Sequence, residues 1–202
     1  MTSLIAIFGG TFDPPHHGHL ALAAAAQVEF DLTRLLWVLT PNPPHKPGQP
    51  ITPLAHRLAM VKLALADAPG CELSTIEIDR PAPYYALDTV RLLSEMHPGA
   101  GLVYLMGGDS LRDLPAWHRP ADLLAALHAI GVMRRPGDSV DLPALEAVLP
   151  GIGAKVRFID TALTDISASE IRRRVAEGLP YRDTLPLTVY DYIQENQLYC
   201  TH

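Results

Sequence analysis

Short apolar runs along the chain alternate with longer segments in which apolar residues recur at helical spacing. Runs that are continuously apolar, or that alternate apolar with polar residues, are typical of strands. They predict strands at residues 4–8, 35–39, 73–78, 102–106, 128–133 and 156–159. Apolar residues three or four positions apart predict helices at residues 20–28, 55–66, 85–96, 121–127, 142–149, 169–177 and 187–195. Regular alternation of the two predicts an α/β fold, a Rossmann-like doubly wound parallel sheet with helices on both faces.

Polar and glycine-containing segments directly follow several of the predicted strands. They are Gly9–His19, Pro41–Lys46, Gly107–Asp109 and Arg134–Arg135. In a doubly wound sheet, ligands bind beyond the carboxyl ends of the strands. We therefore expect these four segments to meet at one site.

The chain is expected to form one domain. Its 202 residues are enough for a substantial core, and no internal repeat or low-complexity linker divides them. The expected domain covers residues 1–202 and ends in a small helical segment from about residue 167 to residue 202.

The composition is that of a soluble globular protein, with 48% hydrophobic and 19% charged residues. The formal net charge of −6 argues against a nucleic-acid surface, which needs many Lys and Arg side chains facing phosphates. No run approaches the roughly 20 apolar residues of a membrane span. The two cysteines lie far apart and suggest neither a disulfide framework nor a zinc site. We expect a cytoplasmic protein without nucleic-acid or membrane partners, and a homo-oligomer stays open.

The turn after the first predicted strand has the features of a phosphate site. Gly9 and Gly10 allow close approach of backbone amides to a ligand. His16 and His19 stand where the next helix begins, and a helix N-terminus offers free N–H groups and a partial positive charge to an anion. A metal site and a capped surface helix are the alternatives for the histidine pair. No third ligand follows at a recognisable metal-site spacing.

A second anion site is predicted near the C-terminus. Ser167 and Glu170 form a Ser-x-x-Glu capping box, which marks a helix start. The arginines 172–174 lie early in that helix, where its positive end disfavours them unless an anion is near. Ser169 and Arg172 could hold phosphate oxygens, and a solvated charge run is the alternative. The P-loop and the G-x-G-x-x-G turn, two widespread phosphate motifs, are both absent from the sequence.

The two motifs together resemble those of the HxGH nucleotidylyltransferase superfamily. These are H-x-G-H at His16–His19, with Gly10, Phe12 and Pro14 before it, and I-S-x-S-x-x-R at Ile166–Arg172. The middle of the chain resembles the bacterial nicotinate mononucleotide adenylyltransferase family. The matching segments are Pro43–Lys46, Arg57, Gly107–Leu111, Trp117, Arg134–Gly137 and, at the end, Leu198–Tyr199.

This resemblance implies an enzyme that transfers the adenylyl group of ATP to nicotinate mononucleotide. It implies a magnesium ion held mainly by the nucleotide, with no metal ligands from the protein. The implied catalytic residues are His16, His19, Lys46 and Arg172. The implied ATP-binding residues are Gly9, Gly10, Thr11, Phe12, Gly18, Arg134, Ile166, Ser167 and Ser169. The implied acceptor-binding residues are His45, Tyr85, Thr89, Asp109 and Trp117.

Some of these roles have structural alternatives. Trp117 would stack on the pyridine ring of the acceptor or be a half-buried core residue. Asp109 would orient the ribose of the acceptor or cap a helix. Tyr84 and Ala86 stand where the family usually has hydroxyl residues, which leaves the preference for nicotinate over nicotinamide open.

Other functions are alternatives to this one. The acceptor could be nicotinamide mononucleotide or another phosphorylated compound. The protein could be a non-catalytic adenine-nucleotide sensor, or a metal-dependent hydrolase that uses the histidines. The joint presence of His16, His19, Ser169 and Arg172 favours the enzyme over the sensor, because a sensor needs no donors aimed at the α-phosphate.

Overall fold

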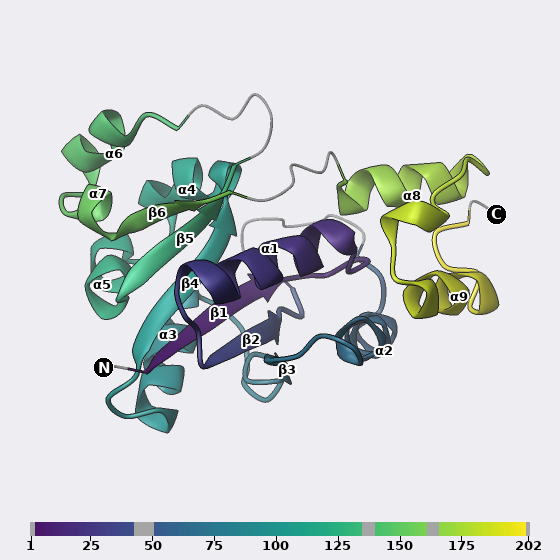
Figure 1. Cartoon of the computed structure of the whole chain (residues 1–202), viewed down its shortest axis with the longest axis horizontal. Coiled ribbons are helices and arrows are strands. Elements are labelled where there is room, and N and C mark those ends of the chain that lie inside the picture. Colours follow the sequence, from purple (N-terminus) through teal and green to yellow (C-terminus); the bar gives the residue numbers. More distant parts are fainter. Residues whose placement is uncertain (1–2, 43–50, 135–139, 161–165, 201–202) are drawn as a thin grey trace.

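A parallel β-sheet forms the centre of the molecule (Figure 1). The structure is a computed structural model that describes residues 3–42, 51–134, 140–160 and 166–200. Within these ranges the strands are β1 (Leu4–Gly10), β2 (Arg34–Leu39), β3 (Cys71–Ser74), β4 (Gly101–Gly107), β5 (Ala129–Met133) and β6 (Val156–Ile159). Their order is β3-β2-β1-β4-β5-β6, and all neighbouring strands are parallel. The predicted Rossmann-like doubly wound sheet is confirmed. Its strand order reverses between β1 and β4, the point at which such sheets bind ligands.

The helices connect and flank these strands. They are α1 (His17–Glu29), α2 (Leu54–Leu65), α3 (Ala86–Met96), α4 (Gly108–Asp113), α5 (Pro120–Ala126), α6 (Leu142–Val148), α7 (Ile152–Lys155), α8 (Ala168–Ala176) and α9 (Leu187–Glu195). Two short 3₁₀ turns are η1 (Leu114–Ala116) and η2 (Arg182–Thr184). The described helices include none that is long and apolar enough to cross a membrane.

Alternate residues of the central strands point into two separate apolar cores. In β1, Ile5 and Ile7 belong to one core, and Ala6 and Phe8 belong to the other. The first core is completed by α3 and α5 and the second by α1 and α2, so α1 and α3 lie on opposite faces of the sheet (Figure 1). Strands buried on both faces read as continuous apolar runs, which is why their positions were predictable from the sequence.

The third predicted strand, residues 73–78, is wrong in its second half. β3 begins earlier, at Cys71, and pairs with β2 only as far as Ser74. Thr75 then closes a local turn, because its carbonyl accepts from the Asp79 N–H at 2.9 Å and its hydroxyl donates to the Asp79 carboxylate at 2.7 Å. Apolar alternation beyond Ser74 arises from a turn whose two isoleucines, at 76 and 78, pack into different cores.

Short helical elements were not predicted from the sequence. They are α4, η1, α7 and η2, each less than two turns long. So few residues cannot display a 3.6-residue period. One of them, α4, begins directly after Gly107, the last residue of β4.

The C-terminal helices pack beside the sheet against α2 (Figure 1). Met60 and Ala64 of α2 form a third apolar cluster with Ile171 of α8 and with Val189 and Ile193 of α9. This packing places the start of α8 near the loop that follows the carboxyl end of β1.

Candidate active site

The loop between β1 and α1 is fixed by a group of aromatic side chains. Phe12 is only 2% exposed, and its backbone has a φ of 46°. Its ring centroid lies 5.3 Å from that of Phe8 and 4.7 Å from that of Trp37. The His19 ring lies against the same group, 5.2 Å from Phe12. These contacts set the position of the His19 ring before any ligand binds.

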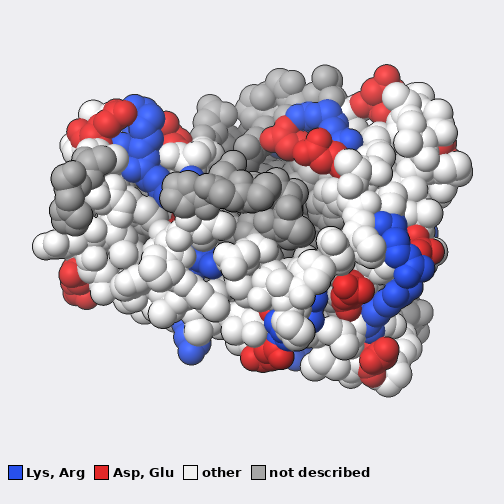
Figure 2. All heavy atoms as spheres, turned by 180° about the vertical axis from the view of Figure 1, so that it is seen from behind, with Lys and Arg blue, Asp and Glu red and all other residues white. Residues whose placement is uncertain are grey.

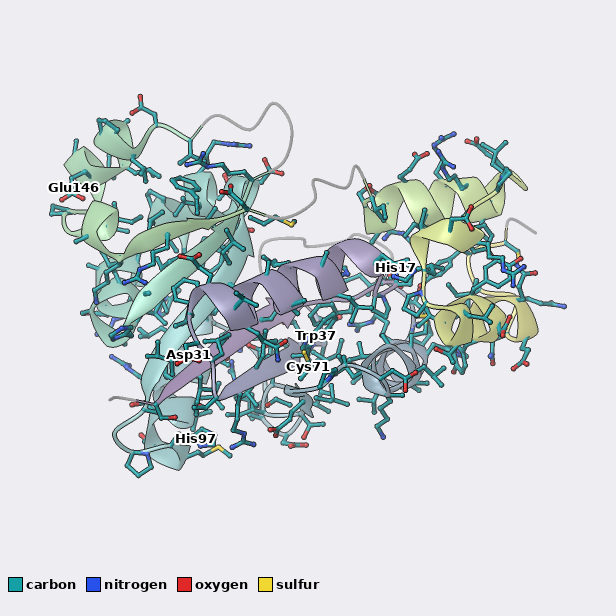
Figure 3. All side chains as sticks on the ribbon, viewed as in Figure 1. His17, Asp31, Trp37, Cys71, His97 and Glu146 are labelled. Atoms are coloured by element: carbon teal, nitrogen blue, oxygen red, sulfur yellow. The ribbon has the colours of Figure 1, made fainter. Side chains whose placement is uncertain are left out.

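The two motif histidines lie together at the start of α1. Their rings are stacked, with centroids 3.7 Å apart. The backbone N–H of His16 donates to Nδ1 of His19 at 3.2 Å. Because Nδ1 accepts, the proton of a neutral His19 ring lies on Nε2, which can then donate to a ligand. His17, between them, is exposed and lies at the end of α1 that faces the C-terminal segment (Figure 3), beside residues 182–187.

Gly9 and Gly10 lie close to side chains inside the protein. A Cβ at Gly9 would lie 2.9 Å from the hydroxyl oxygen of Tyr104, and one at Gly10 would lie 3.2 Å from the Phe12 ring. The predicted reason, approach of a ligand to the backbone, is therefore joined by a second one. A larger residue at Gly9 would press on Tyr104, which contacts Trp117, and one at Gly10 would press on Phe12 of the β1–α1 loop.

The second predicted motif meets the first across the molecule. Arg172 of α8 donates from Nη1 to the backbone carbonyl of Asp13 at 2.7 Å, across 159 positions of sequence. Ser167 caps α8 by accepting from the Glu170 N–H at 3.2 Å, and its hydroxyl oxygen lies 3.2 Å from that of Ser169. The guanidinium of Arg172 and the N-terminus of α8 thus lie at the loop that leads to the histidines.

The expectation that an external anion balances three arginines is wrong for two of them. Arg173 hydrogen-bonds to Glu170 and Glu177, and Arg174 donates to Glu170 at 2.8 Å. These partners lower the pKa of Glu170 to about 2. On the face shown in Figure 2, several described basic side chains likewise adjoin acidic ones, while others stand apart from them. Arg172 differs from its neighbours because it reaches across to another part of the chain.

A buried arginine joins the loops at the carboxyl end of the sheet. Arg57 of α2 is 2% exposed and donates to the carbonyls of Thr11, Thr40, Pro41 and Thr52 at 2.7–3.1 Å. Burial lowers the pKa of its guanidinium, and the nearby carboxylate of Asp13 opposes that shift. From the sequence, Arg57 is recognisable only by its match to the family. No local pattern reveals that its partners are four backbone carbonyls.

His45 and Lys46, which were predicted to bind substrate, lie outside the described residues. The described ends of their loop are both attached to Arg57, through Pro41 on one side and Thr52 on the other. The roles of His45 and Lys46 stay predictions.

The predicted acceptor residues that the structure describes lie on the side of the site that faces α3 and α4. Trp117 is half-buried and meets the Tyr104 ring edge-on, with centroids 6.0 Å apart. Tyr85 stacks on His118, with centroids 4.0 Å apart and an interplanar angle of 15°. His118 was not singled out in the sequence. The only sequence feature that could have pointed to His118 is its position directly after Trp117, which caps the short 3₁₀ turn η1.

Thr89 is part of a buried polar network behind these rings. It is 2% exposed, and its hydroxyl donates to Glu77 at 2.6 Å and accepts from Arg80 at 3.0 Å. Burial raises the pKa of Glu77, while Thr89, Thr40 and Arg80 partly oppose that shift. The Thr89 hydroxyl is therefore already engaged within the protein, and the predicted contact with an acceptor would compete with its hydrogen bonds to Glu77 and Arg80.

Other predicted residues take varied positions. Asp109 is in the first turn of α4, and its exposed carboxylate pairs with Arg112. The Arg134 guanidinium lies 3.8 Å from the centroid of the Phe158 ring, just after β5. Ile166 packs against the C-terminal apolar cluster, and Gly18 is buried in the first turn of α1. No contact of these residues with a ligand is tested, so their roles stay predictions.

We name two parts of the site by their residues. The phosphate side comprises the β1–α1 loop, residues 11–16, with His19 and Arg172. The acceptor side comprises Tyr85, Trp117 and His118. Across the described ranges, no three His, Cys, Asp or Glu side chains come together in a group that could hold a metal.

Comparison with known proteins agrees with this geometry. A family model described as cytidylyltransferase-like matches residues 7–174, which span the sheet and both motifs of the phosphate side. The fold and the site therefore define a nucleotidyltransferase.

Sequence relatives define the family more narrowly. A protein of Thermomicrobium roseum named "probable nicotinate-nucleotide adenylyltransferase" is 48% identical, over 98% of this chain and 92% of its own. A protein of Roseiflexus castenholzii with the same name is 46% identical, over 96% of both chains. The chain belongs to the nicotinate-nucleotide adenylyltransferase family.

Solved structures share the fold. Nicotinic acid mononucleotide adenylyltransferase of Plasmodium falciparum, complexed with NaAD, superimposes with a TM-score of 0.76 at 22% identity. The superposition covers 98% of this chain and 97% of that one. The same enzyme complexed with APC gives a TM-score of 0.75.

Proposed function

We propose that this protein transfers the adenylyl group of ATP to nicotinate mononucleotide and releases pyrophosphate. A phosphate oxygen of the acceptor attacks the α-phosphorus of ATP, the bond from this phosphorus to the bridging oxygen breaks, and pyrophosphate leaves. The product is nicotinate adenine dinucleotide. The acceptor phosphate is already an anion at neutral pH, so no protein nucleophile is required. Catalysis then consists of bringing two polyanions together and stabilising the charge of the transition state.

One observation carries the assignment of roles. The His19 ring is oriented by the His16 N–H so that its Nε2 is a donor, and Arg172 reaches the same loop from α8. In the proposal, His16 and His19 donate to oxygens of the α- and β-phosphates. Arg172, with Lys46, neutralises the departing pyrophosphate. Preorganised donors of this kind are worth more in the transition state than in the bound substrate.

Magnesium is proposed as a partner of the nucleotide. The described phosphate side offers histidine rings, backbone amides and a guanidinium, whereas magnesium prefers oxygen ligands. Its one carboxylate, that of Asp13, is buried and already accepts hydrogen bonds from Tyr199 and Thr52. Phosphate oxygens and water would hold the ion, and it would add positive charge at the transferring group. The chain's own residues orient the phosphates around it.

The acceptor is proposed to bind against the acceptor side. An exposed part of Trp117 is available to stack on a pyridine ring, while its edge contact with Tyr104 holds the indole in place. Nicotinamide mononucleotide is the second candidate acceptor, because Tyr84 and Ala86 stand where the family usually has Ser and Thr.

Pyrophosphate release from Mg-ATP tests the proposal. Nicotinate mononucleotide and nicotinamide mononucleotide are offered separately at equal concentration. We expect fast release with the nicotinate form and slow release with the nicotinamide form. Equal rates would remove the assigned acceptor preference. Release with neither would contradict the transfer itself and favour a nucleotide sensor.

A further inference from the structure

We propose that Asp13 and Tyr199 are positioning residues, which hold Arg172 and the motif histidines in register through a hydrogen bond from the end of the described chain. This inference rests on the proposed function, since it concerns how the phosphate side is held for the transfer. It assigns a task to two residues that contact neither the proposed ATP nor the proposed acceptor in the mechanism above.

Asp13 connects three segments through its own oxygen atoms. Its side chain accepts from the Tyr199 hydroxyl at 2.7 Å and from the Thr52 N–H at 3.1 Å. Its backbone carbonyl accepts from Arg172 at 2.7 Å. The residue is 4% exposed and lies three positions before His16. A movement of Asp13 therefore changes the acceptor of the Arg172 guanidinium and the approach to the histidine pair together.

The Tyr199 hydroxyl is a committed donor. Burial and the facing Asp13 carboxylate raise the pKa of Tyr199, so the phenol keeps its proton. A buried carboxylate needs its hydrogen bonds, because an unsatisfied buried charge is costly. Removing the hydroxyl leaves one oxygen of Asp13 without this donor, and the loop is expected to shift towards another.

The backbone of the C-terminal segment is shaped for this contact. Tyr199 has a φ of 66° and Gln197 a φ of 50°, in the left-handed region that residues other than glycine rarely adopt. Such conformations persist only where surrounding contacts hold them. The Tyr199 ring packs in the C-terminal cluster and its hydroxyl reaches a residue 186 positions earlier. Two independent features, the strained segment and the buried carboxylate, thus converge on one hydrogen bond.

A matched pair of variants tests the proposal in the full-length protein. Tyr199→Phe removes the hydroxyl that faces Asp13. Tyr192→Phe removes a hydroxyl of the same C-terminal cluster, which hydrogen-bonds to Nδ1 of His56 at 3.0 Å. Each variant is characterised by its Tm, its kcat and KM for both substrates, and the Kd of Mg-ATP without acceptor.

We expect Tyr199→Phe to lower kcat/KM for ATP about tenfold, since hydrogen bonds to charged groups have effects of this size. Tyr192→Phe should leave the kinetics within about twofold of the wild type. It should lower Tm about as much as Tyr199→Phe does, as expected for a solely structural hydrogen bond. In an Arg172→Lys background, Tyr199→Phe should have much less effect, because the two residues act on one unit. Asp13→Asn should reproduce the loss seen with Tyr199→Phe.

Three results would overturn the inference. They are unchanged ATP kinetics and Kd in Tyr199→Phe, equal kinetic losses in the two tyrosine variants, or full additivity with Arg172→Lys. An inactive wild-type protein would instead contradict the proposed function. In that case the Kd of Mg-ATP still tests the inference, because we expect it to rise severalfold in Tyr199→Phe alone.

Discussion

The phosphate side and the acceptor side of the site differ in how they are built. The phosphate side joins two short sequence motifs, and one long-range hydrogen bond, from Arg172 to Asp13, brings them together. The acceptor side takes Tyr85 from one segment and Trp117 and His118 from another, and the polar groups behind it, such as Thr89, are used within the fold. Under the proposed function, chemistry at the phosphates would depend on a few prearranged donors. Acceptor recognition would depend on aromatic surfaces and the network behind them.

The largest expected effect concerns the residue that holds the loops of the phosphate side. Arg57→Met leaves four backbone carbonyls without the buried guanidinium that donates to them, so we expect a loss of about 3 kcal/mol or more in the free energy of unfolding. Urea unfolding measures it. Arg91→Met, at an exposed position of α3, is the matched control and should cost less than about 0.5 kcal/mol. Similar costs for both variants would show that the Arg57 contacts contribute little.

The next effect separates catalysis from binding on the same side. His19→Ala removes a donor proposed to act in the transition state, and we expect kcat to fall about a hundredfold or more. The Kd of Mg-ATP should change much less. His17→Ala is the control, because His17 is exposed and faces the C-terminal segment. If the Kd rose by the same factor as kcat fell, His19 would be a binding residue only.

Sequence reasoning was successful where the structure is local. The strand, glycines and histidines of residues 4–19 are contiguous, and the Ser167 cap lies three residues from its partner, so both could be identified directly. Asp13 and Tyr199, by contrast, lie 186 positions apart, and no periodicity connects them.

The dependence of structure on contacts between distant residues also explains the two wrong predictions. The strand predicted over 73–78 had the correct alternation, but pairing with β2 ends at Ser74 and a side-chain hydrogen bond of Thr75 directs the turn. The arginines 172–174 look alike in sequence. Glu170 and Glu177 pair with the last two, whereas Arg172 reaches Asp13, and only tertiary packing decides between these outcomes.

On the acceptor side we expect a smaller and more specific effect. Trp117→Ala should raise KM for nicotinate mononucleotide about tenfold, because stacking on an aromatic ring is worth about 1–3 kcal/mol. KM for ATP should stay nearly constant. Trp117→Phe should recover part of the loss. A lower Tm with an unchanged KM would assign Trp117 to the core instead of to the acceptor.

The smallest expected effect is on the pH dependence of stability. It is seen by comparing Glu77, a buried carboxylate behind the acceptor side, with Glu146, an exposed carboxylate elsewhere. Burial raises the pKa of Glu77, so the folded state holds this proton to higher pH than the unfolded state does. Its contribution to stability is complete below the unfolded pKa and is lost as pH rises through the folded pKa. Glu146, labelled in Figure 3, is the opposite case, because N–H groups of Gly151 and Gly153 donate to it and lower its pKa.

Both contributions, that of Glu77 and that of Glu146, are measured as unfolding free energies between about pH 3 and pH 7. This interval brackets the ordinary Glu pKa. Relative to the wild type, Glu77→Gln should become more stable as pH rises, since the variant lacks the penalty of a buried charge. Glu146→Gln should become less stable over the same interval, since it lacks an anion that its N–H donors stabilise. Slopes of the same sign would contradict this assignment. A flat difference for Glu77→Gln would mean that Thr89, Thr40 and Arg80 fully compensate burial, so that the network behind the acceptor side holds a charge without cost.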